Sequence, residues 1–140
     1  MKIVLAADGS KYTARAVKYL VTHLANFDGS PEVHLLYVQQ PLPGRAAAAV
    51  SLSVLRRYYQ QEGRKALAAA ARALDRVGVH YQEVQRVGDP GRTIAAYAER
   101  GKFPLIMMGS HGQGALSSFL LGSVVRKVLA CCSVPVLIVR

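Results

Sequence analysis

Three glycines and a serine near the end of the chain have the spacing of a phosphate-binding loop. Gly109 and Gly112 directly follow the apolar run 105–108, and nine residues separate Gly112 from the pair Gly122-Ser123. Glycines at the end of a strand let backbone N–H groups approach an anion without obstruction by Cβ atoms. A helix that begins at Gly122-Ser123 adds the partial positive charge of its N-terminus and a hydroxyl donor. The pattern therefore predicts a site for the phosphate of a small molecule, with a nucleotide as the first choice.

The same residues also have an ordinary structural interpretation. Glycines after a strand make turns, and Gly-Ser before an apolar stretch is a common helix cap. Two other nucleotide motifs are absent from the sequence. There is no G-x-x-x-x-G-K-[ST] loop, and Asp8-Gly9-Ser10 follows the first apolar run in place of G-x-G-x-x-G. These absences disfavour a P-loop NTPase and a standard NAD-binding domain.

Asp8 and His111 are the titratable residues whose position suggests a role at this site. Asp8 ends the first apolar run, and a doubly wound sheet brings that strand end beside Gly109. Its carboxylate suits a ribose hydroxyl or a metal ion on the phosphates, or else it complements the dipole of the following helix. His111 lies inside the glycine loop, either as a donor to phosphate or as a solvent-facing side chain. The other histidines, His23, His34 and His80, lack metal-ligand spacing and are assigned no role.

No nucleophile paired with a base can be identified in the sequence. No G-x-S-x-G elbow is present, and no carboxylate follows Glu99. A general base is therefore lacking unless Asp8 supplies one. We predict no catalytic residue and no protein ligand to a metal. The hydroxyls in or near the loop are Ser110, Ser117, Ser118 and Ser123, and the cationic residues of the last stretch are Lys102, Arg126, Lys127 and Arg140.

The elements that position these residues alternate between strand and helix. Ser10 and Asp89 are natural N-caps, with Pro90 at a first helical position, and Gly78 is a left-handed helix terminator. The periodicity predicts strands at 3–7, 33–38, 79–87, 105–108 and 134–139, and helices after Ser10 and at 52–77, 91–100 and 122–130. A turn is expected at 26–30 and a loop without regular structure at 39–45. The apolar side of the long helix is predicted to comprise Leu55, Tyr59, Leu67, Ala70, Leu74 and Val77.

This alternation predicts the fold class. Near-continuous apolar strands indicate a parallel sheet that right-handed crossovers cover on both faces. We predict one α/β domain over residues 1–140, with a five-stranded, doubly wound, Rossmann-like parallel sheet. At 140 residues, such a domain buries about two thirds of the surface of its unfolded chain.

Targeting signals and cysteine usage favour a cytoplasmic protein without a membrane segment. The N-terminus enters a strand pattern directly, and no apolar run approaches the roughly 20 residues that span a bilayer. The two cysteines, Cys131 and Cys132, are adjacent and cannot form a bridge without strain. Reducing surroundings fit this usage, and no further ligand nearby suggests a redox or metal role.

The chain is strongly basic, with 18 Lys and Arg against 8 Asp and Glu and a formal net charge of +10. Such a charge raises the possibility of a nucleic-acid or other anionic partner. The long helix concentrates it, because Arg57, Arg64, Arg72 and Arg76 recur at helical spacing, flanked by Arg56 and Lys65. The alternative is that these arginines form a solvated helix face. No recognised RNA or DNA motif supports the hypothesis of a nucleic-acid partner.

Taken together, these motifs resemble the universal stress protein family, specifically its ATP-binding branch, over essentially the whole chain. The resemblance rests on Asp8-Gly9-Ser10, Val38 closing the second strand, Gly88-Asp89-Pro90, the segment 108–112, Gly122-Ser123-Val124 and the final run 134–139. It implies the fold of the adenine nucleotide alpha hydrolase-like group and a homodimeric stress-response protein. It also implies bound ATP, with Mg or Mn held by the phosphates.

The resemblance further implies a set of binding residues. Asp8 and Val38 lie at the ribose and adenine end, and the glycine loop and the start of the last helix line the ribose and phosphates. The full set is Ala6, Asp8, Val38, Met108, Gly109, His111, Gly112, Gly122, Ser123 and Val124. The chain departs from the family pattern at Gln113 and Gly114, where relatives often carry Arg and a small residue, and at Arg126, which replaces a frequent acidic residue.

Three functions compete at this point. The first is a nucleotide-dependent regulator that holds ATP and is at most a weak ATPase. The second is an efficient ATPase or a nucleotidyl transferase, although Asp8-Gly9-Ser10 stands where an adenylylating enzyme has an H-x-x-H-type pair. The third is a basic module that binds nucleic acid or protein partners without nucleotide turnover. For assembly, the family's strand order places 134–139 at a sheet edge, so we expect a homodimer through the last strand.

Overall fold

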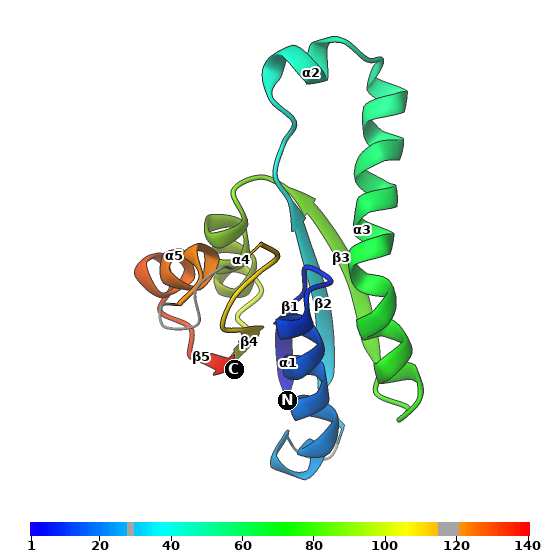
Figure 1. Cartoon of the computed structure of the whole chain (residues 1–140). Helices are drawn as coiled ribbons and strands as arrows, with labels where there is room; N and C mark the ends of the chain where they lie inside the picture. Colours follow the sequence, from blue (N-terminus) through cyan, green and yellow to red (C-terminus); the bar gives the residue numbers. More distant parts are fainter. Residues whose placement is uncertain (28–29, 115–120) are drawn as a thin grey trace.

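A five-stranded parallel sheet forms the centre of the computed structural model, which describes residues 1–27, 30–114 and 121–140 (Figure 1). The strands are β1 (Lys2–Ala6), β2 (Glu32–Gln39), β3 (Tyr81–Val87), β4 (Ile106–Gly109) and β5 (Val136–Val139). The order across the sheet is β3-β2-β1-β4-β5, and every neighbouring pair is parallel. The direction of winding therefore reverses at β1, and the predicted doubly wound α/β fold is confirmed.

Helices cover both faces of the sheet. They are α1 (Lys11–Thr22), α2 (Gly44–Ala48), α3 (Leu52–Asp75), α4 (Pro90–Arg100) and α5 (Ser123–Cys131), with a 3₁₀ turn at Leu24–Phe27. Successive side chains of a strand point to opposite faces, so β1 contributes to two cores. Ile3 and Leu5 pack with α1 and α3, whereas Val4 and Ala6 pack with α4 and α5.

The predicted helix caps and the predicted helix terminator form the expected local interactions. The Ser10 hydroxyl accepts a hydrogen bond from the backbone N–H of Thr13, and the Asp89 carboxylate accepts one from that of Arg92. Gly78 has a φ of +68°, a left-handed conformation that glycine adopts without steric cost. These local signals set the element boundaries to within about two residues, as expected for capping chemistry.

Three of the differences from the predicted boundaries have a local physical cause. The segment 39–45 is not entirely a loop, because α2 begins at Gly44 after Pro43, whose fixed φ is compatible with a helix start. Strand β3 begins at Tyr81, because the N–H of Val79 is used to terminate α3 through the carbonyl of Leu74. Strand β5 begins at Val136, after a proline that has no N–H for the sheet ladder. The predicted turn at 26–30 lies partly outside the described residues.

Helix α3 has two dissimilar halves. Gly63, Ala66, Leu67, Ala70, Ala71 and Leu74 are buried against the sheet. The earlier residues extend beyond the sheet together with α2 (Figure 1). Accordingly Leu55 and Tyr59 are only half-buried, and Val77, predicted on the apolar side, is 43% exposed beyond the last turn. None of the helices in the described ranges is long and apolar enough to cross a membrane.

Candidate functional site

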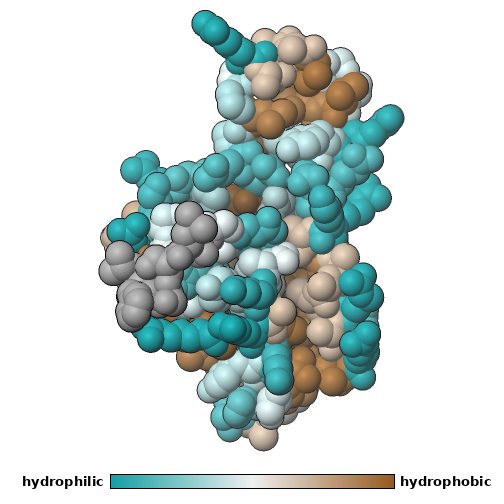
Figure 2. Space-filling view, in the orientation of Figure 1, coloured by the Kyte–Doolittle hydropathy of each residue, from teal (hydrophilic) through white to brown (hydrophobic). Residues whose placement is uncertain are grey.

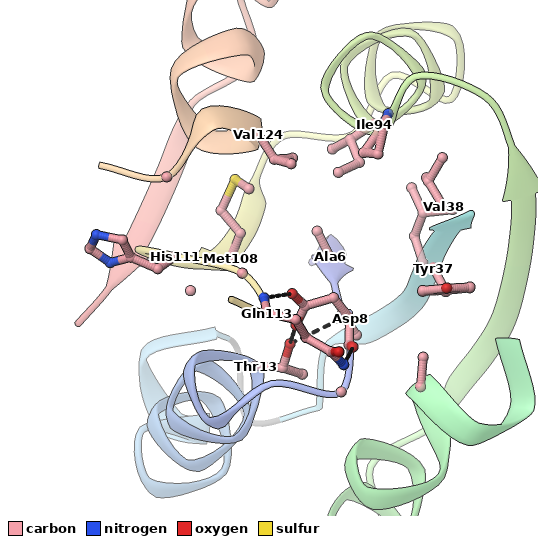
Figure 3. Close-up of a pocket in the computed structure, with 18 of the residues that line it drawn as sticks. Ala6, Asp8, Thr13, Tyr37, Val38, Ile94, Met108, His111, Gln113 and Val124 are labelled. Atoms are coloured by element: carbon pink, nitrogen blue, oxygen red, sulfur yellow. Dashed lines mark hydrogen bonds between the residues drawn. The ribbon is translucent and has the colours of Figure 1, made fainter. Parts of the chain in front are cut away.

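A pocket of about 760 Å³ opens where β1, β2 and β4 end (Figure 3). In an open α/β sheet, the crevice at the reversal of strand order is the usual ligand position. All the residues that the sequence predicted for a binding site line this pocket. They are Ala6, Asp8, Val38, Met108, Gly109, His111, Gly112, Gly122, Ser123 and Val124. The topology therefore brings together residues that are far apart in the sequence.

The Asp8 side chain connects the start of α1 to the glycine loop after β4. One carboxylate oxygen, Oδ1, accepts hydrogen bonds from the Ser10 N–H at 2.9 Å and the Thr13 hydroxyl at 2.8 Å. The other, Oδ2, accepts one from the Gln113 N–H at 3.0 Å. Gln113 returns the contact, since its Nε2 donates to the Asp8 carbonyl at 2.6 Å (Figure 3). The Asp8 carboxylate therefore positions two loops at the rim of the pocket.

The glycines allow backbones to approach closely at this rim. A Cβ atom on Gly112 would lie 2.9 Å from Asp8 Oδ2, and one on Gly109 would lie 2.6 Å from the Cβ of Tyr12. At Gly122 a Cβ would lie 3.1 Å from the Cα of His111. Gly122 also donates its N–H to the Ser110 carbonyl at 2.9 Å. The start of α5 is thus held directly against the loop that follows β4.

The N-terminus of α5 faces this loop without a capping side chain. Its N-cap is Gly122, and within residues 1–27, 30–114 and 121–140 no side chain accepts from its first turn. The N–H groups of Ser123 and Val124 have no acceptor among the residues that the structure describes. Unpaired N–H groups and the positive end of the helix dipole together favour an anion at this position.

His111 lies at the margin of the pocket. Its Nδ1 is 3.0 Å from the Ser110 hydroxyl, and its ring centroid is 5.0 Å from that of Tyr12. Its Nε2 is buried and has no hydrogen-bond partner in the described ranges. In Figure 3 the ring points outward, away from Asp8. Of the two alternatives for His111, the solvent-facing one does not describe Nε2, which is buried where the ring packs against Tyr12. The role as a phosphate donor stays a prediction.

The pocket has an apolar side and a polar side. Val38, Ile94, Met108 and Val124 form the apolar side (Figure 3). The polar side chains of Tyr37, Glu62 and Lys65 line the pocket from β2 and α3. The Tyr37 hydroxyl donates to Gln39 Oε1 at 2.6 Å, and burial, followed by the negative charge of Glu62, raises the pKa of this phenol.

Several of these lining residues were missed by the sequence analysis. Thr13 and Gln113 carry the hydrogen bonds of the rim, and Ile94, Glu62 and Lys65 come from the middle of helices. No motif marks them, because their position depends on how each helix crosses the sheet. Two hydroxyls noted in the sequence, Ser117 and Ser118, lie outside the described residues. The described residues hold no group of three or more His, Cys, Asp and Glu that could bind a metal ion.

The fold and the pocket define an open α/β protein with a pocket at its topological switch point, where such folds usually bind their ligands. A model of the universal stress protein family matches residues 1–140. The chain belongs to this family. Universal stress protein MJ0531 of Methanocaldococcus jannaschii is 33% identical over 141 residues, which cover 99% of this chain and 81% of that protein.

Solved structures share the fold. That of MJ0577, a universal stress protein of the same archaeon, has a TM-score of 0.80 and 30% identity, covering 99% of this chain and 94% of the other. A family protein from Arabidopsis thaliana, solved with AMP bound, has a TM-score of 0.68 and 18% identity, with 99% and 90% covered. A universal stress protein in complex with cAMP has a TM-score of 0.70 and 23% identity, with 100% and 97% covered.

Proposed function

We propose that the chain binds an adenine nucleotide, ATP in the first place, and acts as a nucleotide-dependent regulator in the stress response. The observation that carries this proposal is the uncapped N-terminus of α5 beside the glycine loop. The helices α1, α3 and α4 each have an N-cap side chain that accepts from their first turn. Helix α5 instead presents its free N–H groups to the pocket, where phosphate oxygens can accept them.

The two sides of the pocket suit the two ends of a nucleotide. Phosphates are assigned to Gly112, Gly122 and Ser123, where backbone N–H groups and one hydroxyl converge. The base is assigned to the apolar surface of Val38, Ile94 and Val124. A volume of about 760 Å³ falls within the range of small-molecule sites. The AMP and cAMP complexes support the choice of an adenine nucleotide, because they place such ligands on this fold.

A divalent metal ion, Mg or Mn, would be held by the phosphates and not by a protein cluster. The Asp8 carboxylate, which lies beside the glycine loop, is already occupied on both oxygens by hydrogen bonds to Ser10, Thr13 and Gln113. This leaves it little capacity to ligate a metal or to act as a general base. We therefore propose that turnover is slow or absent, far below the median enzyme rate of about 10 per second.

Thermal denaturation with and without ATP and magnesium tests the binding proposal on protein shown to be nucleotide-free. A ligand that binds only the folded state stabilises it by about 2.7 kcal/mol at a hundredfold excess over Kd. Gly112→Val should abolish the shift, since its side chain enters the space of the Asp8 carboxylate. The matched control is Gly44→Ala, where a Cβ meets nothing within 4 Å and the shift should persist. An unchanged melting temperature for the wild type at millimolar ATP would refute the proposal.

We also propose that two copies pair through β5. This strand is at the edge of the sheet, its residues are half-buried, and Arg140 is the only charged residue in the run 134–140. An apolar edge strand is an aggregation hazard unless it is covered. Two copies cover it when their edge strands pair about a two-fold axis, the commonest symmetry of homo-oligomers. Leu137→Lys is expected to give monomer or precipitate. A wild-type protein that sediments as a monomer at micromolar concentration would exclude the dimer.

A further inference from the structure

Exposed apolar side chains gather at one end of the molecule. We name residues 42–61, which include α2 and the first turns of α3, the arm. Val50 is 41% exposed, Leu52 71%, Val54 51% and Tyr58 37%. These are four of the eight large apolar side chains that are exposed in the described ranges. Figure 2 shows apolar surface at the end of the arm, which projects beyond the sheet.

The arm carries positive charge only. No acidic residue occurs between Glu32 and Glu62, whereas Arg45, Arg56 and Arg57 all lie on the arm and are exposed. None of these arginines forms an ion pair with another described residue. The surface therefore combines aliphatic side chains with unneutralised guanidinium groups.

The arm has a defined internal structure. The Leu42 N–H donates to the Tyr59 hydroxyl at 2.9 Å, which ties the segment after β2 to α3. The Ser51 hydroxyl accepts from the Val54 N–H at 3.4 Å and so caps α3. The apolar end is therefore presented by a capped helix, and a hydrogen bond ties the segment that enters the arm to the helix that leaves it.

The distances along α3 match the depth of a lipid interface. Leu52 and Val54 are in the first turn, and Arg56 and Arg57 follow within about one turn. At 1.5 Å per residue, the arginines lie roughly 6–8 Å behind Leu52 along the helix axis. Helices that lie in the plane of the interface bury their apolar face roughly 5–10 Å into the boundary between headgroups and acyl chains, and an arm that enters end-on to a similar depth would bury Leu52 and Val54. The arginines would then be level with lipid phosphates.

We propose that the arm docks on membranes that contain anionic lipids, with Val50, Leu52 and Val54 among the headgroups and the arginines on the phosphates. A second copy is a poorer partner, because the arms of two copies repel each other. Nucleic acid is also poorer, since it offers nothing apolar to Leu52. A protein partner would need a cavity that accepts a projecting end. The proposal is independent of the nucleotide site.

Vesicle flotation tests the proposal with the full chain. The wild type should bind vesicles of phosphatidylcholine mixed with phosphatidylglycerol, and not vesicles of phosphatidylcholine alone. The double variant R56Q/R57Q should bind about 25-fold more weakly, since each arginine near an anionic surface contributes about fivefold. The matched control R72Q/R76Q removes two exposed arginines from the other end of the same helix and should change binding less than twofold. L52S/V54S should also lose binding, although it keeps the charge.

A fluorescent reporter locates the contact, because the chain contains no tryptophan. Leu52→Trp should shift its emission to the blue on addition of the mixed vesicles. Val77→Trp, at an exposed position beyond the other end of α3, should not. Circular dichroism of both variants confirms that they are folded.

Four results would overturn the proposal. The first is no wild-type binding to the mixed vesicles, and the second is an equal loss in R72Q/R76Q, which would indicate attraction by net charge alone. The third is a wild-type protein that binds a single-stranded RNA but not the vesicles, with RNA binding lost in R56Q/R57Q and retained in L52S/V54S. The fourth is a smaller sedimenting mass for L52S/V54S than for the wild type, which would assign the apolar end to contact between copies.

Discussion

Helices α4 and α5 both begin at the pocket, and their N-termini differ in one respect. At α4, the Asp89 carboxylate accepts from the Arg92 N–H at 3.0 Å and pairs with Lys127 of α5 at 2.7 Å. At α5, Gly122 offers no side chain to the first turn. Both ends have free N–H groups by virtue of helix geometry. The chain neutralises one end with its own carboxylate and leaves the other available.

The difference shows which helix end can serve as an anion site. At α4 the Asp89 carboxylate accepts from the Arg92 N–H and complements the dipole, so a phosphate there would meet negative charge. Beside the glycine loop that faces α5, the Asp8 carboxylate is directed to Ser10, Thr13 and Gln113 instead. The pocket therefore has one closed and one open helix terminus, and the contrast can be altered by substitution.

The largest effect is expected when α5 is made to resemble α4. Ser123→Asp places a carboxylate in the first turn of α5, where it repels phosphate. At an effective dielectric constant of 20, two unit charges about 4 Å apart interact by about 4 kcal/mol. We therefore expect at least a hundredfold weaker ATP binding, measured by calorimetry. The free protein should become slightly more stable, because an acidic residue there complements the dipole.

Ser123→Ala is the control for this substitution, since it removes the hydroxyl without adding charge. It should weaken ATP binding by less than Ser123→Asp. Equal losses in both variants would mean that the hydroxyl, and not the open helix end, governs binding.

An intermediate effect is expected when the rim is loosened. In Asp8→Asn, an amide NH₂ group replaces the carboxylate oxygen that accepts from the Gln113 N–H. The loop therefore loses a charge-assisted hydrogen bond. Hydrogen bonds to charged groups contribute roughly 1.5–3 kcal/mol, and we expect a loss of this order in the free energy of unfolding, measured in urea. Gln113→Ala removes only the exposed side-chain contact and should cost less. A smaller loss for Asp8→Asn than for Gln113→Ala would contradict the positioning role.

The smallest effect is expected at the closed terminus. The Lys127 ammonium, followed by the Arg92 N–H, lowers the pKa of Asp89 below its ordinary value of 3.8. A lowered pKa means that Asp89 stabilises the folded state fully above that ordinary value, and that the contribution is lost as the pH falls through the lowered value. Asp89→Asn keeps the cap but loses the charge.

Melting temperatures between pH 7 and pH 2 measure this effect. The wild type should melt above Asp89→Asn at neutral pH, and the gap should close as the pH falls below the ordinary pKa of the carboxyl. A gap that is constant over this range would show that the pairing with Lys127 contributes nothing.

Features that depend on a few neighbouring residues could be predicted from the sequence. The Ser10 and Asp89 caps and the left-handed Gly78 are decided by local backbone chemistry, and all are observed. The alternation of apolar runs with amphipathic helices predicts a parallel doubly wound sheet, because both faces of such strands must be covered. That topology in turn places Asp8 and the glycine loop at one edge, which explains why the predicted binding residues line one pocket.

Other features depend on contacts between distant segments, and only the tertiary structure reveals them. The sequence left Asp8 between a ligand role and a dipole role, whereas the fold directs its carboxylate to the backbone of Gln113, 105 residues away. Glu62 and Lys65 reach the pocket because of the angle at which α3 crosses the sheet. The exposure of Leu52 arises because α3 is longer than the sheet beneath it. Periodicity reports which side of a helix is apolar, but not where the surface that it covers ends.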